Sequence, residues 1–294
     1  MWWLLGCTLL QGPNTKKEVS TQTESIEHVL TPPQIPSKGL EFSSVYSKIL
    51  IQDEGSVRSL YFVRDSGEIV LETAIDLQKK ESLQVPYTKG MFVSHAFIPK
   101  IESSLLIGLG GGAMIHFIDH HWPDQKMIAV DIDPVIVDIA KNYFAVPNNE
   151  KIALYAEDGF VFIKKAKKNN ITYNVIYMDA FLKPSSDTDS TGVPLRLKTL
   201  AFYDELQSIL KPNGIVVFNI NYHKDINTDL EHILESFEQV WKLAVPDRGN
   251  IIVVATTNKT DRTTLSNRAT QIDKEKGIGI GEWVDRLQEW SIEN

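Results

Sequence analysis

The segment from residue 104 to residue 133 constrains the fold of this chain more than any other part of the sequence. A short apolar run at 105–107 leads directly into a glycine-rich turn, Gly108-Leu109-Gly110-Gly111-Gly112. A helix-compatible stretch and a second apolar run follow, and the second run ends in Asp131-Ile132-Asp133. A strand that turns at once into a helix needs residues that adopt φ > 0, and a ligand lying against bare backbone needs positions without side chains. The sequence therefore predicts a βαβ unit.

The acidic end of this unit indicates the class of ligand. Asp131 follows the glycine turn by about 20 residues, the spacing that places a carboxylate at the tip of the next parallel strand, within reach of ribose hydroxyls. We expect a nucleoside to be bound by Asp131, Ile132 and the turn residues Gly108, Gly110, Gly111 and Gly112. NAD stays open, because Ala113 is the permitted substitute for the third glycine of the dinucleotide pattern. The structural alternative is an ordinary loop with a solvated acid at 131.

Composition excludes several classes of protein. The chain has 294 residues, of which 43% are hydrophobic, so it can bury a sizeable core. A formal charge of −8 argues against a broad nucleic-acid-binding face, which needs clustered Lys and Arg. Its single cysteine excludes an internal disulfide and a thiolate cluster for zinc, and we expect no metal cofactor. No apolar run reaches the roughly 18 to 20 residues of a membrane-spanning helix.

The amino terminus leaves two interpretations open. Leu4-Leu5-Gly6-Cys7 is similar to the lipobox of a bacterial lipoprotein, and a polar stretch follows it to about residue 40. Only three residues precede the box, without the basic region and the roughly 7 to 15 apolar residues of an export signal. We therefore expect residues 1–40 to be a disordered tether or leader and the protein to be cytoplasmic, with lipid attachment at Cys7 as the alternative.

The rest of the chain divides by its hydrophobic pattern. Residues 41–80 are predicted to form a small β-hairpin domain, with strands at 45–52, 57–64 and 68–72 separated by Asp-x-Gly turns. From 81 to 260, apolar runs alternate with helical patterns, which is typical of a parallel sheet covered on both faces. The predicted helices lie at 85–97, 112–121, 134–145, 159–168, 199–210 and 228–239, and the predicted strands at 105–108, 127–131, 152–155, 175–178, 215–219 and 251–255.

The last part of the chain, residues 261–294, is predicted to be a helical tail. Trp283, Leu287 and Trp290 are spaced to share one face of a helix that docks on the core. An aromatic lid over a substrate is the alternative use of this stripe. Upstream, Lys211-Pro212-Asn213-Gly214 is predicted to be a turn that leads into the fifth strand.

Acidic residues recur at the predicted strand tips, where ligands bind in open parallel sheets. Asp158 precedes Gly159 at the start of a helix, so it is a candidate helix cap as well as a candidate acceptor for an adenine amino group. Asp179 ends the apolar run 175–178 and opens a loop of about 15 residues. We expect Asp179 to bind the charged end of a ligand or to deprotonate an amine, and its alternative role is to order the loop.

At these residues, from about 45 to 256, the chain resembles the spermidine synthase family within the wider class of adenosylmethionine-dependent transferases. The similar segments are Gly110-Gly111-Gly112, Val130-Asp131-Ile132-Asp133, Glu157-Asp158-Gly159-Phe160, the hairpins ending in 71–77, Pro86-Tyr87-Thr88 and the final hairpin around 245–255. The resemblance implies a Rossmann-like, seven-stranded, mostly parallel sheet of the class I methyltransferase type. It also implies that adenosylmethionine or its decarboxylated form is the co-substrate, with Asp179 as the amine-deprotonating residue and Tyr87 as a second catalytic residue retained from the family pattern.

The chain departs from the family pattern where the acceptor and the donor tail are expected. Ala113 stands where the family has an aspartate, Asp76 where it has a glutamine, and Thr88-Lys89 where it has His-Glu. The family loop Asp-Ser-Ser-Asp-Pro is replaced after Asp179. A polyamine needs several converging carboxylates, because each buried ammonium must be paired. Asp76, Asp187 and Asp189 are candidate replacements.

The resulting expectation is a spermidine synthase-like transferase that moves an aminopropyl group to an amine or polyamine. A methyltransferase with an unknown acceptor is the first alternative, and Ala113 favours it slightly. A non-catalytic nucleoside-binding module, lipid-anchored if the box at Cys7 is real, is the second, and an NAD-dependent oxidoreductase is the third. The hairpin edges leave a homodimer open.

Overall fold

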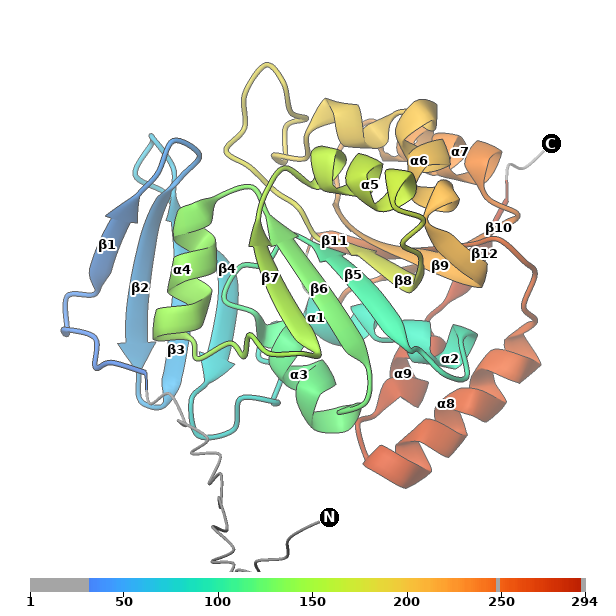
Figure 1. The fold of residues 1–294 in the computed structure, drawn as a ribbon, viewed down its shortest axis with the longest axis horizontal. Coiled ribbons are helices and arrows are strands. Elements are labelled where there is room, and N and C mark those ends of the chain that lie inside the picture. Colours follow the sequence, from blue (N-terminus) through green and yellow to red (C-terminus); the bar gives the residue numbers. More distant parts are fainter. Residues whose placement is uncertain (1–31, 247–248, 292–294) are drawn as a thin grey trace, which may run out of the picture. The chain divides into compact units, whose positions relative to one another are not determined.

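The computed structural model describes residues 32–246 and 249–291, and the predicted lipobox at Cys7 lies outside these residues. The described chain contains two sheets, a four-stranded one from its first part and an eight-stranded one from the rest (Figure 1). None of the helices in these two ranges combines the length and the apolar character needed to cross a membrane.

The small sheet is an antiparallel meander. Its strands are β1 (Leu40–Ser43), β2 (Lys48–Glu54), β3 (Val57–Val63) and β4 (Ile69–Asp76), in that order across the sheet. Gly55 (φ +62°) and Gly67 (φ +84°) occupy the two turns that the Asp-x-Gly pattern predicted, because these tight turns require positive φ. The hairpins are confirmed, and β1 is a strand that the sequence pattern did not predict.

The large sheet has the order β12-β10-β11-β9-β8-β5-β6-β7. The five strands from β9 to β7 are mutually parallel, whereas β11, β10 and β12 pair antiparallel. The strands are β5 (Ser103–Ile107), β6 (Lys126–Asp131), β7 (Ile152–Ala156), β8 (Tyr173–Met178), β9 (Leu210–Asn221), β10 (Gln239–Ala244), β11 (Asn250–Thr256) and β12 (Gln288–Trp290). The predicted mostly parallel α/β sheet is therefore present, with β12 as an eighth strand.

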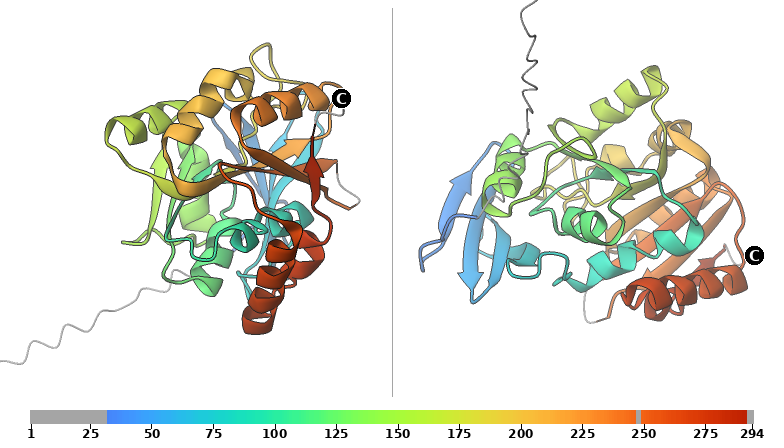
Figure 2. Two further views of the ribbon diagram at one scale, coloured as in Figure 1. Left: turned by 90° about the vertical axis from the view of Figure 1, so that its right-hand side faces the viewer. Right: turned by 60° about the horizontal axis from the view of Figure 1, so that its bottom comes forward.

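Helices cover both faces of this sheet, as the apolar runs require. They are α1 (Pro86–Met91), α2 (Ser94–Phe97), α3 (Ala113–His121), α4 (Pro134–Tyr143), α5 (Gly159–Lys168), α6 (Leu200–Ser208), α7 (Ile226–Ser236), α8 (Arg262–Lys276) and α9 (Ile280–Val284). Helices α5, α6 and α7 pack on one face, and α8 and α9 on the other (Figure 1, Figure 2).

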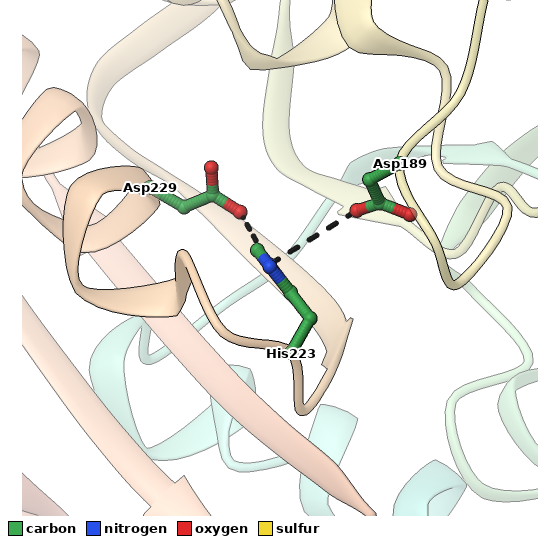
Figure 3. Close-up of side chains that lie close together, drawn as sticks. All are labelled: Asp189, His223 and Asp229. Carbon is green, nitrogen blue, oxygen red and sulfur yellow. Dashed lines mark hydrogen bonds and ion pairs between the residues drawn. The ribbon is translucent and has the colours of Figure 1, made fainter. Parts of the chain in front are cut away.

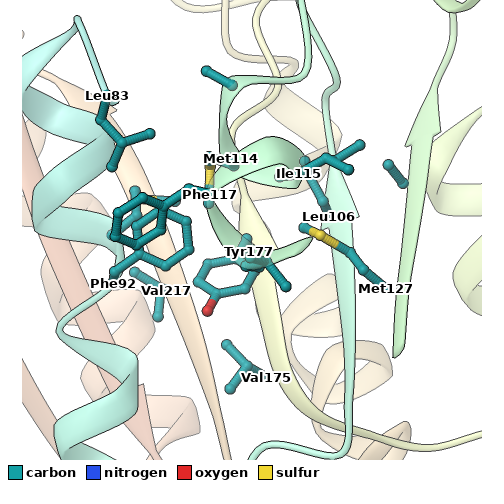
Figure 4. Close-up of a cluster of buried hydrophobic side chains, with 14 of the residues drawn as sticks. Leu83, Phe92, Leu106, Met114, Ile115, Phe117, Met127, Val175, Tyr177 and Val217 are labelled. Atoms are coloured by element: carbon teal, nitrogen blue, oxygen red, sulfur yellow. The ribbon is translucent and has the colours of Figure 1, made fainter. Parts of the chain in front are cut away.

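The core forms two layers because neighbouring residues on a strand point to opposite faces. On β8, Val175 and Tyr177 belong to the layer that contains α3, and Ile176 and Met178 belong to the layer that contains α5. Figure 4 shows the first layer, in which Tyr177 lies near Phe117 and Met114 of α3.

Three expected element boundaries differ from the structure. The helix expected at 85–97 is two short helices, α1 and α2. Strand β10 begins at Gln239, where the sequence pattern predicted the end of a helix. The turn expected at 211–214 lies inside β9, where Asn213 has φ +63° and the pairing with β8 jumps from Tyr173–Leu210 to Val175–Ile215. The local turn residues are there as predicted, but the backbone resumes the same strand after them.

The predicted helix containing Trp283, Leu287 and Trp290 is wrong. Helix α9 ends at Val284, and Trp290 lies in β12, which pairs with the edge of β10. Trp283 packs against the core layer that contains α3, whereas Trp290 packs against the layer that contains α5. Residues 288–290 pair with the free edge of β10, because an open strand edge offers unsatisfied hydrogen-bonding groups.

The polar contacts that join the small sheet to the large one include one from the β1–β2 connection, one from β4 and one from β3. Ser44 of the β1–β2 connection donates to the carboxylate of Asp133, the residue that caps α4 (2.5 Å). On β4, the hydroxyl of Thr73 accepts from the backbone N–H of Gly111 (2.9 Å). The third contact comes from Arg58 on β3, which is 1% exposed.

Arg58 is a buried cation whose hydrogen bonds are well satisfied. Its guanidinium binds both carboxylate oxygens of Asp53 (2.7 and 2.8 Å) and donates to the backbone carbonyls of Tyr143 (2.6 Å) and Pro33 (2.8 Å). Tyr143 ends α4, so the positive charge also lies at the carboxyl end of that helix, where it is favoured. Removing this one side chain leaves a carboxylate and two carbonyls without their partner.

We therefore expect Arg58→Met to lower the free energy of unfolding by about 3–5 kcal/mol, the usual cost of breaking a partly buried ion pair from one side. Urea denaturation measures this change. Arg64→Met is the matched control, because Arg64 pairs with Glu68 at an exposed site and should contribute no more than about 1 kcal/mol. Equal losses in the two variants would show that Arg58 does not join the sheets.

Candidate active site

A cavity lies at the carboxyl ends of β5, β6 and β8, where sequence reasoning placed the ligand. We call it the strand-tip cavity. Its wall includes eight of the ten predicted site residues: Tyr87, Gly108, Gly110, Asp131, Ile132, Asp158, Gly159 and Asp179. These residues come from five separate segments of the chain, and the fold brings them to one place because parallel strands end at the same edge.

Different glycines of the turn line the cavity and pack against the core. Gly108 (φ +95°) and Gly110 (φ +53°) lie on the cavity wall, whereas Gly111 and Gly112 are buried away from it. A Cβ on Gly111 would lie 3.0 Å from Phe144, and one on Gly112 would lie 2.4 Å from Val146. The structure therefore places Gly111 and Gly112 in the packing beneath the turn and not on the cavity wall.

Asp131 is oriented by the turn that it faces. One carboxylate oxygen accepts from the backbone N–H of Leu109 and the other from that of Asp133, both at 2.9 Å. Burial raises its pKa above the usual range, and these backbone hydrogen bonds oppose the rise. An ionised carboxylate has about four acceptor positions, so Asp131, which lines the cavity, keeps acceptor capacity for a ligand.

Asp158 caps a helix, which is the first of the two roles that the sequence left open, and its other oxygen pairs with a cation. Its Oδ1 accepts from the backbone N–H of Phe160 (2.9 Å) and caps α5, as predicted. Its Oδ2 accepts from the guanidinium of Arg196 (2.6 Å), and both side chains line the strand-tip cavity. Arg196, in the 3₁₀ helix Leu195–Lys198, had no sequence signal beyond its place after the long loop.

Asp179 lies at the end of β8 and is held from two sides. The hydroxyl of Tyr87 donates to Oδ2 (3.0 Å), and the amide of Asn219 on β9 donates to Oδ1 (2.8 Å). The amide of Asn250 on β11 donates in turn to the side-chain oxygen of Asn219 (2.9 Å), so the residue that orients Asp179 is itself held by a hydrogen bond. Burial raises the pKa of Asp179, and burial also raises the pKa of Tyr87 well above its usual range.

Glu72 is a further acid in the cavity that sequence reasoning missed. It extends from β4, and burial together with the negative charge of Asp179 raises its pKa to about 7. The sequence signal was a lone acid within the apolar segment 69–75, which resembled the family without having an assigned role. The small sheet thus contributes a titratable side chain to a site that otherwise belongs to the large sheet.

A second cavity adjoins the first, and we call it the side cavity. It is bordered by the β1–β2 connection, the β3–β4 hairpin and the loop after β8, and Glu72 and Tyr87 line both cavities. The candidate replacement acids Asp76, Asp187 and Asp189 line neither of them. Glu72 therefore occupies the position for which those three residues were considered.

Asp189 instead belongs to a cluster that fastens the loop (Figure 3). Within residues 32–246 and 249–291, Asp189, His223 and Asp229 form the one group of at least three potential metal ligands whose ligand atoms lie close together. The ammonium of Lys198 lies 2.6 Å from Asp189 Oδ2, 2.5 Å from Asp229 Oδ2 and 3.3 Å from His223 Nε2. A single side-chain cation already bridges these two carboxylates, and it joins the loop to α7.

Comparisons with known proteins agree with this geometry. The chain matches the spermine/spermidine synthase domain over residues 91–264, more than half of its length. A polyamine aminopropyltransferase from Chromobacterium violaceum is 27% identical to it over 248 residues, which cover 82% of this chain and 90% of that protein.

Two solved structures show the same fold. Human methyltransferase-like protein 13 in complex with SAH aligns with a TM-score of 0.60 and 19% identity, covering 71% of this chain and 96% of that one. A spermidine synthase in complex with the transition-state analogue AdoDATO aligns with a TM-score of 0.60 and 16% identity, covering 84% of this chain and 89% of that one. The predicted class I methyltransferase-like fold is thereby confirmed.

The region that matches the family contains the glycine turn, Asp131, Asp158 and Asp179, the residues on which the sequence resemblance was based. The expected transferase class is confirmed with it. This chain belongs to the spermine/spermidine synthase domain family.

Proposed function

We propose that the protein transfers an aminopropyl group from decarboxylated adenosylmethionine to an amine acceptor. The observation that carries this proposal is the pair of acids, Asp179 and Glu72, where the strand-tip cavity meets the side cavity. A donor tail that ends in an ammonium is favoured beside two carboxylates, and a tail that ends in a carboxylate is not. In the described part of the chain, Arg196 is the one Lys or Arg lining the strand-tip cavity, and Asp158 already pairs with it.

The donor nucleoside is assigned to the strand-tip cavity. The free acceptor positions of Asp131 face the ribose hydroxyls, and Ile132 packs beside the adenosine. Gly108 and Gly110 offer bare backbone, and Gly159 begins the helix behind the adenine. Asp158 contacts the adenine amino group after sharing or releasing Arg196. The SAH and AdoDATO complexes of the two structural neighbours support a ligand of this chemistry.

The reaction needs alignment and the removal of one proton. The neutral amine attacks the carbon next to the positive sulfur, the new N–C bond forms, and the C–S bond breaks with its electrons on sulfur. Methylthioadenosine leaves, and the amine proton passes to Asp179. The raised pKa of Asp179 suits a general base, because a more basic carboxylate accepts a proton more readily. Tyr87 and Asn219 orient it.

Methyl transfer from adenosylmethionine is the second candidate. Ala113, which lines the strand-tip cavity where the family pattern has an acid, favours it. Glu72 weighs against it, since this side chain restores a carboxylate to the cavity. We propose cytoplasmic action, where such donors are expected, and the lipid-anchored, non-catalytic module remains the alternative.

The donor preference separates these candidates. We expect calorimetric titration to show decarboxylated adenosylmethionine binding at least about tenfold more tightly than adenosylmethionine, because the acids at the cavity junction oppose the donor carboxylate. Methylthioadenosine, which lacks the charged tail, is the reference ligand. Tighter binding of intact adenosylmethionine would support methylation, and the absence of binding by all three would contradict a transferase.

Asp179→Asn should lower kcat by about 10²–10⁴-fold, since the variant keeps the shape of the side chain and loses its basicity. Donor affinity should change less than about threefold, which titration with methylthioadenosine measures. Asp187→Asn, in the exposed part of the same loop, is the matched control and should retain activity. Full activity in Asp179→Asn would assign the base to another residue.

Activity should rise as the pH passes through about 7, because Glu72 must ionise to attract a cationic ligand. Below that pH its carboxyl is protonated and neutral, so the attraction is lost. The pH profile of kcat/KM measures this limb, and Glu72→Gln should remove it. Glu68→Gln, an exposed acid at the next turn, should leave the profile unchanged. A limb near pH 7 that persists in Glu72→Gln would belong to a different group.

A further inference from the structure

The side cavity is the place for the acceptor, because it adjoins the donor cavity at the reacting end. The two cavities share one wall, formed by Phe62, Glu72, Val85, Tyr87, Phe181 and Leu182. Asn219, which lines the side cavity, donates to Asp179 on the other side of that wall. An acceptor amine at the shared wall therefore lies beside Glu72 and close to the base.

The shared wall carries the acid Glu72, whereas the part of the side cavity beyond it is lined by cations. Lys48, Arg64 and Lys183 line it and do not line the strand-tip cavity. Lys183 pairs with Asp65, whose pKa is lowered by Lys183 first and also by Lys48. Arg64 pairs with Glu68 (3.0 Å). Three cations and two anions leave this end with a net positive charge.

Two of these cations form ion pairs only with exposed carboxylates. The Arg64 and Lys183 side chains are 42% and 50% exposed, and their partners Glu68 and Asp65 are 57% and 65% exposed. Exposed pairs of this kind contribute little to stability, so a ligand anion can displace them. Arg64 also offers a planar pair of donors that matches a carboxylate.

A diamine and an amino acid would meet this end differently. The second ammonium of a diamine would face three like charges, whereas a carboxylate in the same place would be paired by them. Within residues 32–246 and 249–291, Asp65 and Glu72 are the two carboxylates on the wall of the side cavity. Glu72 lies at the reacting end, so Asp65, already bound to Lys183, is the one acid left for a distal ammonium.

We propose that the acceptor is an ω-amino carboxylate: a primary amine joined through a short carbon chain to a carboxylate group. Resting on the proposed function, this assignment places the amine at the shared wall and the carboxylate against Arg64 and Lys183. The amine nitrogen forms the bond to the aminopropyl carbon, the C–S bond breaks, methylthioadenosine leaves, and the proton passes to Asp179. The product is an N-(3-aminopropyl) amino acid.

The test compares acceptors of equal length. The full chain, saturated with methylthioadenosine, is titrated with 4-aminobutanoate, 5-aminopentanoate and 6-aminohexanoate, and separately with the diamines of four, five and six carbons. We expect at least one amino acid to bind about tenfold or more tightly than its matched diamine at low salt. Diamines that bind as well at every length, or amino acids that do not bind at all, would overturn the assignment.

Charge reversal provides the second measurement. Arg64→Glu combined with Lys183→Glu should reverse the preference toward the diamine and leave methylthioadenosine affinity within about threefold. Lys168→Glu combined with Lys274→Glu, which makes the same change of charge at exposed positions outside both cavities, should keep the preference for the amino acid. An unchanged preference in the first double variant would overturn the assignment.

Failure of the proposed function looks different from failure of the acceptor assignment. If neither methylthioadenosine nor either donor binds, the transferase proposal fails. If an amino acid binds in the expected order but no aminopropylated product forms with decarboxylated adenosylmethionine, mass spectrometry of the mixture contradicts the reaction and supports the acceptor site. Product formation from the diamine alone contradicts the acceptor assignment and supports aminopropyl transfer.

Discussion

The close approach of β4 to the glycine turn determines how the site is built. The hydroxyl of Thr73 accepts from the N–H of Gly111, and a Cβ on Gly110 would lie 2.4 Å from that hydroxyl oxygen. Without glycine at 110, the small sheet could not sit this near the tips of the parallel strands. Because the residue before Thr73 is Glu72, the same contact carries an acid from the small sheet into a cavity of the large one. The joint between the two sheets is therefore also part of the candidate active site.

Three acidic side chains are buried together at this joint, which is unfavourable for their charged forms. Asp131, Asp179 and Glu72 are removed from water, and burial raises the pKa of each. Fixed donors offset the cost for two of them: backbone N–H groups for Asp131, and Tyr87 and Asn219 for Asp179. Glu72 has no such donor among the hydrogen bonds of the described residues, and burial together with the charge of Asp179 raises its pKa to about 7. An ammonium bound beside Glu72 would lower this pKa, because an opposite charge favours the ionised carboxylate.

Local sequence signals predicted much of the fold, and their failures have a common cause. The βαβ unit, the cap at Asp133, the cap at Asp158 and the hairpin turns follow from short-range rules and are present. The helix prediction for Trp290 was wrong because its strand, β12, forms by pairing with the open edge of β10, a partner 50 residues away in the sequence. Gly111 and Gly112 were assigned to the ligand because a glycine pattern alone does not distinguish contact with a ligand from contact with Phe144 or Val146.

The sequence by itself determined the parallel α/β core, its family and the acids Asp131, Asp158 and Asp179 at the strand tips, because these follow from periodicity and from residues close together in the chain. Only the tertiary structure decided which charges face one another. Glu72 lies near the charge of Asp179 across 107 positions of sequence, Arg196 reaches Asp158 from beyond the long loop, and Lys198 pairs with Asp189 outside both cavities. Electrostatic energy depends on distance in space and on exclusion of water, and neither quantity is encoded in the spacing of residues along the chain.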